Sequence, residues 1–205
     1  MQLVLATNNE DKIREITHLL EDLPITILSR GDFLEFPDPE ESGMTLEENA
    51  LIKARAIADF TGFPALADDS GLEVDALSGA PGVFSSRYAG PNATYNDNCR
   101  KLVDALSGIM EEKRTARFRC VIAIAWDEET VVTVDGEVDG LITADIVGES
   151  GFGYDPVFYH SPSGKRFSQM SLDEKNAISH RGLALAKARD VIIDRLNRGD
   201  AGKGA

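Results

Sequence analysis

The sequence predicts a single α/β domain, on the basis of three observations. At 205 residues, the chain is long enough for one well-buried domain, whereas two full domains would be cramped. In its first third, short apolar runs typical of strands alternate with segments of helical periodicity. Further on, residues 117–126 and 131–138 alternate apolar and polar side chains and are joined by a polar turn, which indicates a hairpin. We find no internal repeat and no linker that would separate two domains.

The composition argues against several classes of protein. Hydrophobic residues make up 42% and charged residues 27%, as in ordinary soluble globular proteins. No apolar run approaches the roughly 18 residues of a membrane span, and the N-terminus does not have the pattern of a signal peptide. Cys99 and Cys120 are too few for a disulfide framework. We therefore expect a cytoplasmic protein that does not act at a membrane.

The formal net charge of −14 argues against a protein that binds nucleic acid through a basic surface. The same charge raises a question if the ligand is an anion. An acidic protein that binds phosphate needs lysines, helix N-termini or a metal ion to reverse the electrostatic field at the site. Any anion site in this chain must therefore be a local cluster of positive groups.

The first candidate for such a cluster lies between a strand at residues 3–6 and a helix at residues 12–21. The intervening residues 7–11 are rich in side chains that cap helices. A strand that leads into a helix start gathers backbone N–H groups and Lys12 around one point, which makes an anion site. The segment lacks the glycines and the Lys-Ser/Thr pair of a Walker A loop. Ordinary helix capping is the alternative interpretation.

A second strand at residues 25–28 is followed by a predicted loop at residues 31–43, which contains the acidic Glu40 and Glu41. Thr45 and Glu48 then form a capping box, which predicts a helix from there to about residue 60. Polar residues on the predicted buried face of this helix either extend their side chains to the surface or face a polar cavity. The predicted inner stripe is Leu46, Ala50, Ile57 and Phe60, with Asn49 and Lys53 at the same phase.

Residues 68–71, with the sequence Asp-Asp-Ser-Gly, lie between two predicted strands at residues 63–67 and 72–77. Adjacent carboxylates repel each other. A hard cation such as Mg²⁺, bound by carboxylate oxygens, is one reason to hold both at one place. The alternative is an Asx-type turn, in which Asp and Ser bond to nearby backbone groups and Gly takes a positive φ. This stretch alone leaves both interpretations open.

The later elements are a helix at residues 95–107, ended by Gly108, and the hairpin, which we expect to be scaffold. Residues 148–156 then combine closely spaced glycines with Phe152 and Tyr154. The glycines let a backbone approach a ligand, and the aromatic rings offer flat faces to a base. A strand rather than a helix follows, so this is no dinucleotide-binding fingerprint. A structural hairpin corner is the alternative.

Ser171 and Glu174 form a second capping box, and Lys175 follows it. His180 beside Arg181 makes a cationic pair at a possible helix start, which chemistry could use, although a lone His is more often structural. The C-terminal helix should end near residue 196. The domain would then span residues 1–196, with a disordered tail at residues 197–205.

Several short motifs occur in order along the chain: Leu5-Ala6-Thr7-Asn8-Asn9 with Lys12, Asp68-Asp69-Ser70-Gly71-Leu72, Gly79-Ala80-Pro81-Gly82, Ser86-Arg87-Tyr88, Gly151-Phe152-Gly153-Tyr154-Asp155-Pro156, and Lys175 with Ser179-His180-Arg181. Each motif is weak alone, but the ordered set resembles the inosine triphosphate pyrophosphatase family over nearly the whole chain. One departure is Asn8, where the family often has glycine. Asn also tolerates left-handed backbone angles, so we expect little effect.

The resemblance implies an elongated α/β fold, in which a long mixed β-sheet with flanking helices forms two lobes around a central cleft. It implies a hydrolase that cleaves ITP, dITP and XTP between the α- and β-phosphates, giving the nucleoside monophosphate and pyrophosphate. Such an enzyme removes non-standard purine nucleotides from the nucleotide pool. The family is usually homodimeric and uses Mg²⁺, with Mn²⁺ as the alternative metal.

The resemblance also implies roles for individual residues. Glu41 and Asp69 would hold Mg²⁺, with Glu40 and Asp68 as further candidates. Asp69 would be the catalytic residue that orients or deprotonates the attacking water. The substrate would be bound by Thr7, Asn8, Asn9, Glu10, Asp11 and Lys12 at the phosphates, by Lys53, Ser70 and Lys175, and by Phe152, Gly153, Tyr154, Asp155, His180 and Arg181 at the base and sugar.

Two other functions compete with this one. The first is a septum-type pyrophosphatase that acts on pyrimidine or modified nucleotides, against which the Phe-Gly-Tyr-Asp and Ser-His-Arg motifs argue. The second is a sensor that binds a nucleotide without turnover. Clustered acids at Glu41, Asp68 and Asp69 argue against a sensor, because an anion binder gains nothing from them without a metal.

Overall fold

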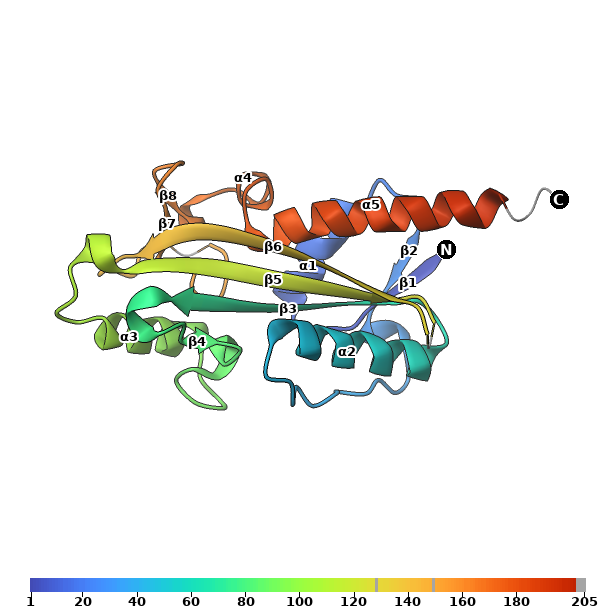
Figure 1. The fold of residues 1–205 in the computed structure, drawn as a ribbon, viewed down its shortest axis with the longest axis horizontal. Coiled ribbons are helices and arrows are strands. Elements are labelled where there is room, and N and C mark those ends of the chain that lie inside the picture. The colour runs from blue at the N-terminus through green and yellow to red at the C-terminus, as the bar shows by residue number, and fades with distance from the viewer. Residues whose placement is uncertain (128, 149, 202–205) are drawn as a thin grey trace. The chain divides into compact units, whose positions relative to one another are not determined.

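The structure is a computed structural model that describes residues 1–127, 129–148 and 150–201 (Figure 1). Within these residues, an eight-stranded sheet has the order β2-β1-β3-β5-β6-β7-β8, with β4 paired to β3. The strands are β1 (Gln2–Leu5), β2 (Thr26–Leu28), β3 (Ala65–Val74), β4 (Pro81–Gly82), β5 (Thr115–Ala125), β6 (Val131–Ile142), β7 (Phe158–His160) and β8 (Lys165–Arg166). The helices are α1 (Glu10–Leu20), α2 (Leu46–Thr61), α3 (Tyr95–Ala105), α4 (Leu172–Asn176) and α5 (His180–Ala201).

Both parallel and antiparallel strand pairs occur in this sheet. β1 is parallel to β2 and to β3, whereas β3–β4, β6–β7 and β7–β8 are antiparallel. The predicted α/β class with a mixed sheet and flanking helices is therefore confirmed. None of the helices in the described part of the chain is long and apolar enough to cross a membrane.

The chain divides into two compact units. The first unit comprises Met1–Asp69, Val121–Gly136 and Gly182–Ala205, and the second comprises Ser70–Cys120 and Glu137–Arg181.

The first unit contains the parallel strands β2 and β1 and the first half of β3, connected by α1 and α2. Parallel neighbours need such crossover connections, because a short turn cannot return the chain to the same end of the sheet. Helix α2 starts with the predicted capping box, in which the Thr45 Oγ1 accepts from the Glu48 N–H. Its buried face includes Ala54 and Ala58, whereas Phe60 is 50% exposed. The prediction that Phe60 belongs to the buried face of α2 is therefore wrong. Alanines lie on several faces of this helix, so the sequence did not define which face is buried.

Residues 68–71 neither separate two strands, as predicted, nor form the Asx-type turn that the sequence left open. They lie inside β3, which is continuous from Ala65 to Val74 (Figure 1). The turn preference of Asp, Ser and Gly is a local tendency, and tertiary contacts override it here. Because successive side chains of a strand point to opposite faces, Asp68 and Asp69 must face different sides of the sheet.

The second unit has a core of aromatic side chains around Phe118, Phe158 and Phe167. The ring centroids of Phe118 and Phe158 lie 4.6 Å apart, and those of Phe158 and Phe167 lie 4.8 Å apart. Helix α3 covers this core with buried Cys99 and Leu102. The antiparallel strands β6, β7 and β8 lead from the core to the segment that precedes α4.

Helix α5 starts at His180, as predicted, and continues to Ala201. Residues 197–201 are thus helical where the sequence predicted a disordered tail. The rest of that predicted tail, residues 202–205, lies outside the described residues.

Candidate active site

The first carboxylate of the central pair, Asp68, is fully buried and faces helix α1. The Lys12 Nζ lies 3.1 Å from the Asp68 Oδ2 and 3.5 Å from the Asp68 carbonyl oxygen. The side chain of Lys12 keeps 16% of its surface exposed. Lys12 therefore neutralises Asp68 while part of its side chain stays exposed.

The second carboxylate, Asp69, meets helix α2 instead. The Lys53 Nζ donates to the Asp69 Oδ1 at 3.0 Å, to the Glu41 Oε1 at 2.8 Å and to the Asp68 carbonyl oxygen at 2.9 Å. An ammonium group has three protons to donate, so these three oxygens use its full capacity. The two predicted metal ligands, Glu41 and Asp69, are thus brought together around the Lys53 ammonium group. Glu40, a further candidate, is exposed.

Asn49 joins this group, although the sequence motifs did not assign it a role. Its Nδ2 donates to the Asp69 Oδ2 at 3.3 Å, and its Oδ1 accepts from the Gly43 N–H at 2.8 Å. It is fully buried and connects Asp69 to the loop that carries Glu41. A Cβ at Gly43 would lie 2.7 Å from the Asn49 Oδ1, so the loop needs glycine to approach this closely. Asn49 lies four residues before Lys53, so the two share one helix face. This spacing was the signal in the sequence that could have identified Asn49 as part of the site.

Replacing Asn49 by Ala is expected to lower the free energy of unfolding by about 1–3 kcal/mol, because the buried Asp69 carboxylate loses a donor and the part-buried Gly43 N–H loses its acceptor. Urea denaturation measures this difference. The control is Asn197→Ala at an exposed position inside α5. It makes the same Asn-to-Ala change in helix propensity without removing a buried hydrogen bond. Equal stabilities of the two variants would contradict the structural role of Asn49.

Burial and charge act in opposite directions on Asp69 and Lys53. Burial raises the pKa of Asp69, and Glu41 adds to this effect, while Lys53 and Lys12 oppose it. Burial would lower the pKa of Lys53, but Asp69, Asp68 and Glu41 outweigh it and raise that pKa. Lys53 therefore stays charged, and Asp69 is a more basic carboxylate than usual. A raised pKa suits a group that accepts a proton from water.

The loop before α1 is a helix cap in this structure. The Asn9 Oδ1 accepts from the backbone N–H groups of Asp11 and Lys12 at 3.0 and 3.3 Å. The Asn9 N–H donates to the Thr7 Oγ1 at 3.2 Å, and the Asn8 Nδ2 donates to the Asp38 Oδ1 at 3.0 Å. The capping interpretation is therefore correct for Asn9. An anion at this helix start, where the exposed Glu10 also lies, would compete with Asn9 for the two N–H groups.

In the second unit, several predicted substrate-binding residues contact one another. The Lys175 Nζ lies 2.6 Å from the Asp155 Oδ2, which also accepts from the Phe152 N–H at 2.9 Å. The Phe152 ring has Lys175 and Arg181 near it, with the Lys175 Nζ at 4.6 Å and the Arg181 guanidinium carbon at 5.3 Å from its centroid. The Arg181 Nη2 donates to the Ser70 Oγ at 3.2 Å. Ser70, Phe152, Asp155, Lys175 and Arg181 therefore form one connected set.

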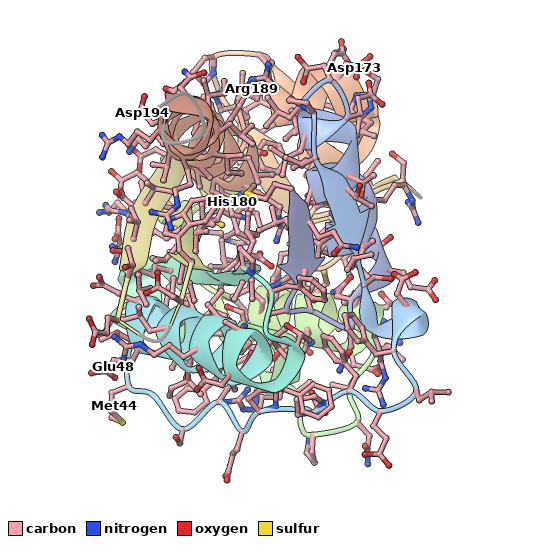
Figure 2. All side chains as sticks on the ribbon, turned by 90° about the vertical axis from the view of Figure 1, so that its right-hand side faces the viewer. Met44, Glu48, Asp173, His180, Arg189 and Asp194 are labelled. Carbon is pink, nitrogen blue, oxygen red and sulfur yellow. The ribbon has the colours of Figure 1, made fainter. Side chains whose placement is uncertain are left out.

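Other predicted residues of the second unit turn towards the protein interior. The Tyr154 hydroxyl donates to the Ser85 carbonyl oxygen at 2.8 Å, and burial raises its pKa. The His180 ring, at the start of α5 (Figure 2), stacks on Phe118 with centroids 4.6 Å apart and planes within 10°. The Gly153 carbonyl accepts from the Cys99 Sγ at 3.3 Å. Tyr154 therefore does not offer the flat face predicted for a base, and the half-buried Phe152 ring has Lys175 and Arg181 over it.

The residues around Lys53 have the donor chemistry that Mg²⁺ prefers. The Glu41 Oε1, the Asp69 Oδ1 and the Asp68 carbonyl oxygen all converge on one point. Mg²⁺ is commonly held by one or two carboxylates together with phosphate oxygens of a substrate. Within residues 1–127, 129–148 and 150–201, no group of three or more His, Cys, Asp or Glu side chains is arranged to hold a metal ion. The donor set therefore fits a metal that is shared with a substrate.

Comparisons with known proteins agree over most of the chain. The model of the Ham1 family matches residues 3–191. The dITP/XTP pyrophosphatase of Geobacter sulfurreducens is 51% identical over 191 residues, which cover 93% of this chain and 96% of the relative. That of Desulforamulus reducens is 49% identical over 192 residues, with 94% and 96% covered. The solved structure of a HAM1 protein from Coxiella burnetii is 45% identical, with a TM-score of 0.87 and 95% and 99% covered.

Proposed function

This chain belongs to the Ham1 family, and on that premise we propose that it hydrolyses non-standard purine nucleoside triphosphates. The substrates are dITP, XTP and ITP, and the products are the nucleoside monophosphate and pyrophosphate. The observation that supports this function best is the meeting of Glu41, Asp69 and Lys53 at one point. That arrangement combines a basic carboxylate with a positive charge, which hydrolysis of a phosphoanhydride requires.

The first unit supplies the groups for phosphate chemistry. Lys12 and Lys53 donate hydrogen bonds to phosphate oxygens and balance the charge of the leaving pyrophosphate. Asp69 orients the attacking water and accepts its proton, and burial favours this role because it raises the pKa of the carboxyl group. Mg²⁺ held by Glu41 and Asp69 would supply charge neutralisation at the phosphate oxygens. Asn49 keeps Asp69 and the Glu41 loop in place.

We assign the nucleoside to another set of residues. Lys175 and Arg181 are donors without acceptor capacity, and both lie near the Phe152 ring. A purine with a 6-oxo group can accept a hydrogen bond from such a donor, whereas the 6-amino group of adenine presents another donor. Each unpaired buried polar group costs about 1–3 kcal/mol, so two contacts of about 1.4 kcal/mol each are enough to discriminate about 100-fold against ATP.

The same proposal includes Mg²⁺ as the cofactor, with Mn²⁺ as a substitute, and a cytoplasmic homodimer. The support for Mg²⁺ is the oxygen donor set around Lys53. The dimer and the location rest on the resemblance to the family. Size-exclusion chromatography with light scattering measures the oligomeric state directly.

A substrate panel tests the function. We expect ITP, XTP and dITP with Mg²⁺ to yield equal amounts of monophosphate and pyrophosphate, at rates about 100-fold above those for ATP. Removal of divalent metal by EDTA should abolish turnover, because the phosphate charge is then not neutralised. Release of orthophosphate alone, or equal rates with ATP and ITP, would overturn the proposal. Faster cleavage of dTTP or UTP would favour the septum-type activity, and tight binding without product would favour a sensor.

A further inference from the structure

The most unusual feature of the first unit is that one buried ammonium group occupies the point where the proposed metal ligands converge. Lys53 is 8% exposed, and its Nζ lies between 2.8 and 3.0 Å from the Glu41 Oε1, the Asp69 Oδ1 and the Asp68 carbonyl oxygen. These are the oxygens that the previous section assigns to Mg²⁺. A lysine ammonium and a magnesium ion cannot occupy one point among the same oxygens.

We propose that Lys53 acts as a stand-in for the metal, so that the nucleotide-free protein binds Mg²⁺ weakly and gains the ion only together with the triphosphate. This inference rests on the proposed function and names a positioning role for Lys53. The two carboxylates around it carry two negative charges, and the ammonium cancels one of them. A divalent ion that entered the site with Lys53 in place would meet both a reduced attraction and a direct repulsion.

The triphosphate provides the means to move Lys53. A lysine side chain is a flexible stem with a point charge, and the multiply charged oxygens of a triphosphate can compete for it with the two carboxylates and the carbonyl oxygen that hold it. When Lys53 turns from Glu41 and Asp69 to a phosphate, both carboxylates become available to a metal. Binding of the nucleotide and binding of the metal are then coupled, and by reciprocity each strengthens the other. Such coupling prevents the free site from holding a metal before the substrate arrives.

Metal binding without nucleotide tests this role. Titration with Mg²⁺ by calorimetry, or with Mn²⁺ by electron paramagnetic resonance, gives the dissociation constant of the nucleotide-free protein. Lys53→Met keeps the length of the side chain and removes its charge. We expect this variant to bind the metal about tenfold or more tightly than the wild type, within the range typical of coupled sites. A non-hydrolysable triphosphate analogue should make the two proteins more similar, because it already displaces Lys53 in the wild type.

Two lysine variants serve as controls. Lys187→Met removes the same charge from an exposed lysine of the first unit, which pairs with Asp135, and should leave the metal affinity unchanged. Lys12→Met releases Asp68 instead of Asp69. Tighter binding in Lys12→Met but not in Lys53→Met would move the metal to Asp68 and overturn the inference. Equal affinities of Lys53→Met and the wild type would overturn it as well.

Loss of Lys53 leaves buried carboxylates without their cation, so the variant can lose stability. In that case the melting temperature becomes the readout. Mg²⁺ or Mn²⁺ should raise it more in Lys53→Met than in the wild type, and equal shifts would refute the role. These measurements need no turnover. A protein that fails the substrate panel can still show the predicted metal binding, and an active protein can fail to show it.

Discussion

Replacing Asp69 by Asn is expected to reduce kcat by about 1,000-fold, a loss typical of removing a general base, while the protein stays folded. The amide keeps the size of the side chain, and Lys53 retains Glu41 and the Asp68 carbonyl as partners. The fold should therefore persist, but the buried Asp69 carboxyl group, whose pKa is raised by burial, is no longer there to accept a proton from water. Steady-state rates with ITP and circular dichroism spectra measure the two effects.

The Mg²⁺ dependence separates the two roles of Asp69. A loss that persists at saturating Mg²⁺ indicates that Asp69 acts on the water, whereas recovery at high Mg²⁺ indicates only a metal ligand. Asp59→Asn is the matched control, because Asp59 is an exposed aspartate of the same helix that carries Lys53. Its kcat should equal that of the wild type. A near-normal rate in Asp69→Asn would place the catalytic base elsewhere.

The largest effect on stability is expected from Lys175→Met in the second unit. Lys175 and Asp155 are 2.6 Å apart with side chains only 6% and 3% exposed. Removing the lysine takes the buried cation away from the buried Asp155 carboxylate, and breaking a buried pair in this way typically costs about 3–5 kcal/mol. Urea denaturation measures the loss. The double variant Lys175→Met with Asp155→Asn should recover part of it, because the buried charge is then absent.

A second lysine pair of the same unit provides the control. The Lys165 Nζ lies 2.7 Å from the Glu174 Oε1, a similar distance, but the two side chains are 44% and 50% exposed. Solvent screens such a pair, so Lys165→Met should change the free energy of unfolding by about 0–1 kcal/mol. If Lys175→Met and Lys165→Met lower the free energy of unfolding by the same amount, burial does not explain the contribution of the Lys175–Asp155 pair.

Local signals in the sequence predicted the helices well. The capping boxes at Thr45 and Ser171 are both present, because each depends on two side chains three residues apart. The start of α5 at His180 was also correct. Such features need no knowledge of the rest of the chain, so a single sequence reveals them.

The same local reasoning failed at residues 68–71. The Asp-Asp-Ser-Gly sequence favours a turn, but the partners that keep it extended are distant in the chain. Lys12 is 56 residues from Asp68, and Lys53 is 16 residues from Asp69. The sequence indicated these lysines as phosphate ligands but did not reveal which carboxylate each one meets. That pairing depends on how side chains alternate between the two faces of a continuous strand. The sequence placed residues 68–71 between two strands, so this alternation could not be used.

The contacts of the aromatic and imidazole rings could likewise not be predicted from neighbouring residues in the sequence. Phe152 and Tyr154 are two residues apart, yet Phe152 contacts two cations and Tyr154 reaches the Ser85 carbonyl. His180 and Arg181 are adjacent, yet the first stacks on Phe118 and the second bonds to Ser70. Which ring faces the interior is decided by packing against residues remote in sequence.

The uninterrupted course of β3 has a consequence for how this protein can vary. Substitutions at Asp68 or Asp69 change one charge at a time, and each leaves the other carboxylate with its own lysine. Insertion or deletion of one residue within the strand would exchange the two sides, since side chains alternate with a period of two. An insertion before Asp68 would turn Asp68 towards Lys53 and leave Lys12 without a carboxylate, whereas a deletion there would turn Asp69 towards Lys12 and place Ser70 opposite Lys53. The distance of the two aspartates from the start of this strand is therefore constrained as tightly as their identity.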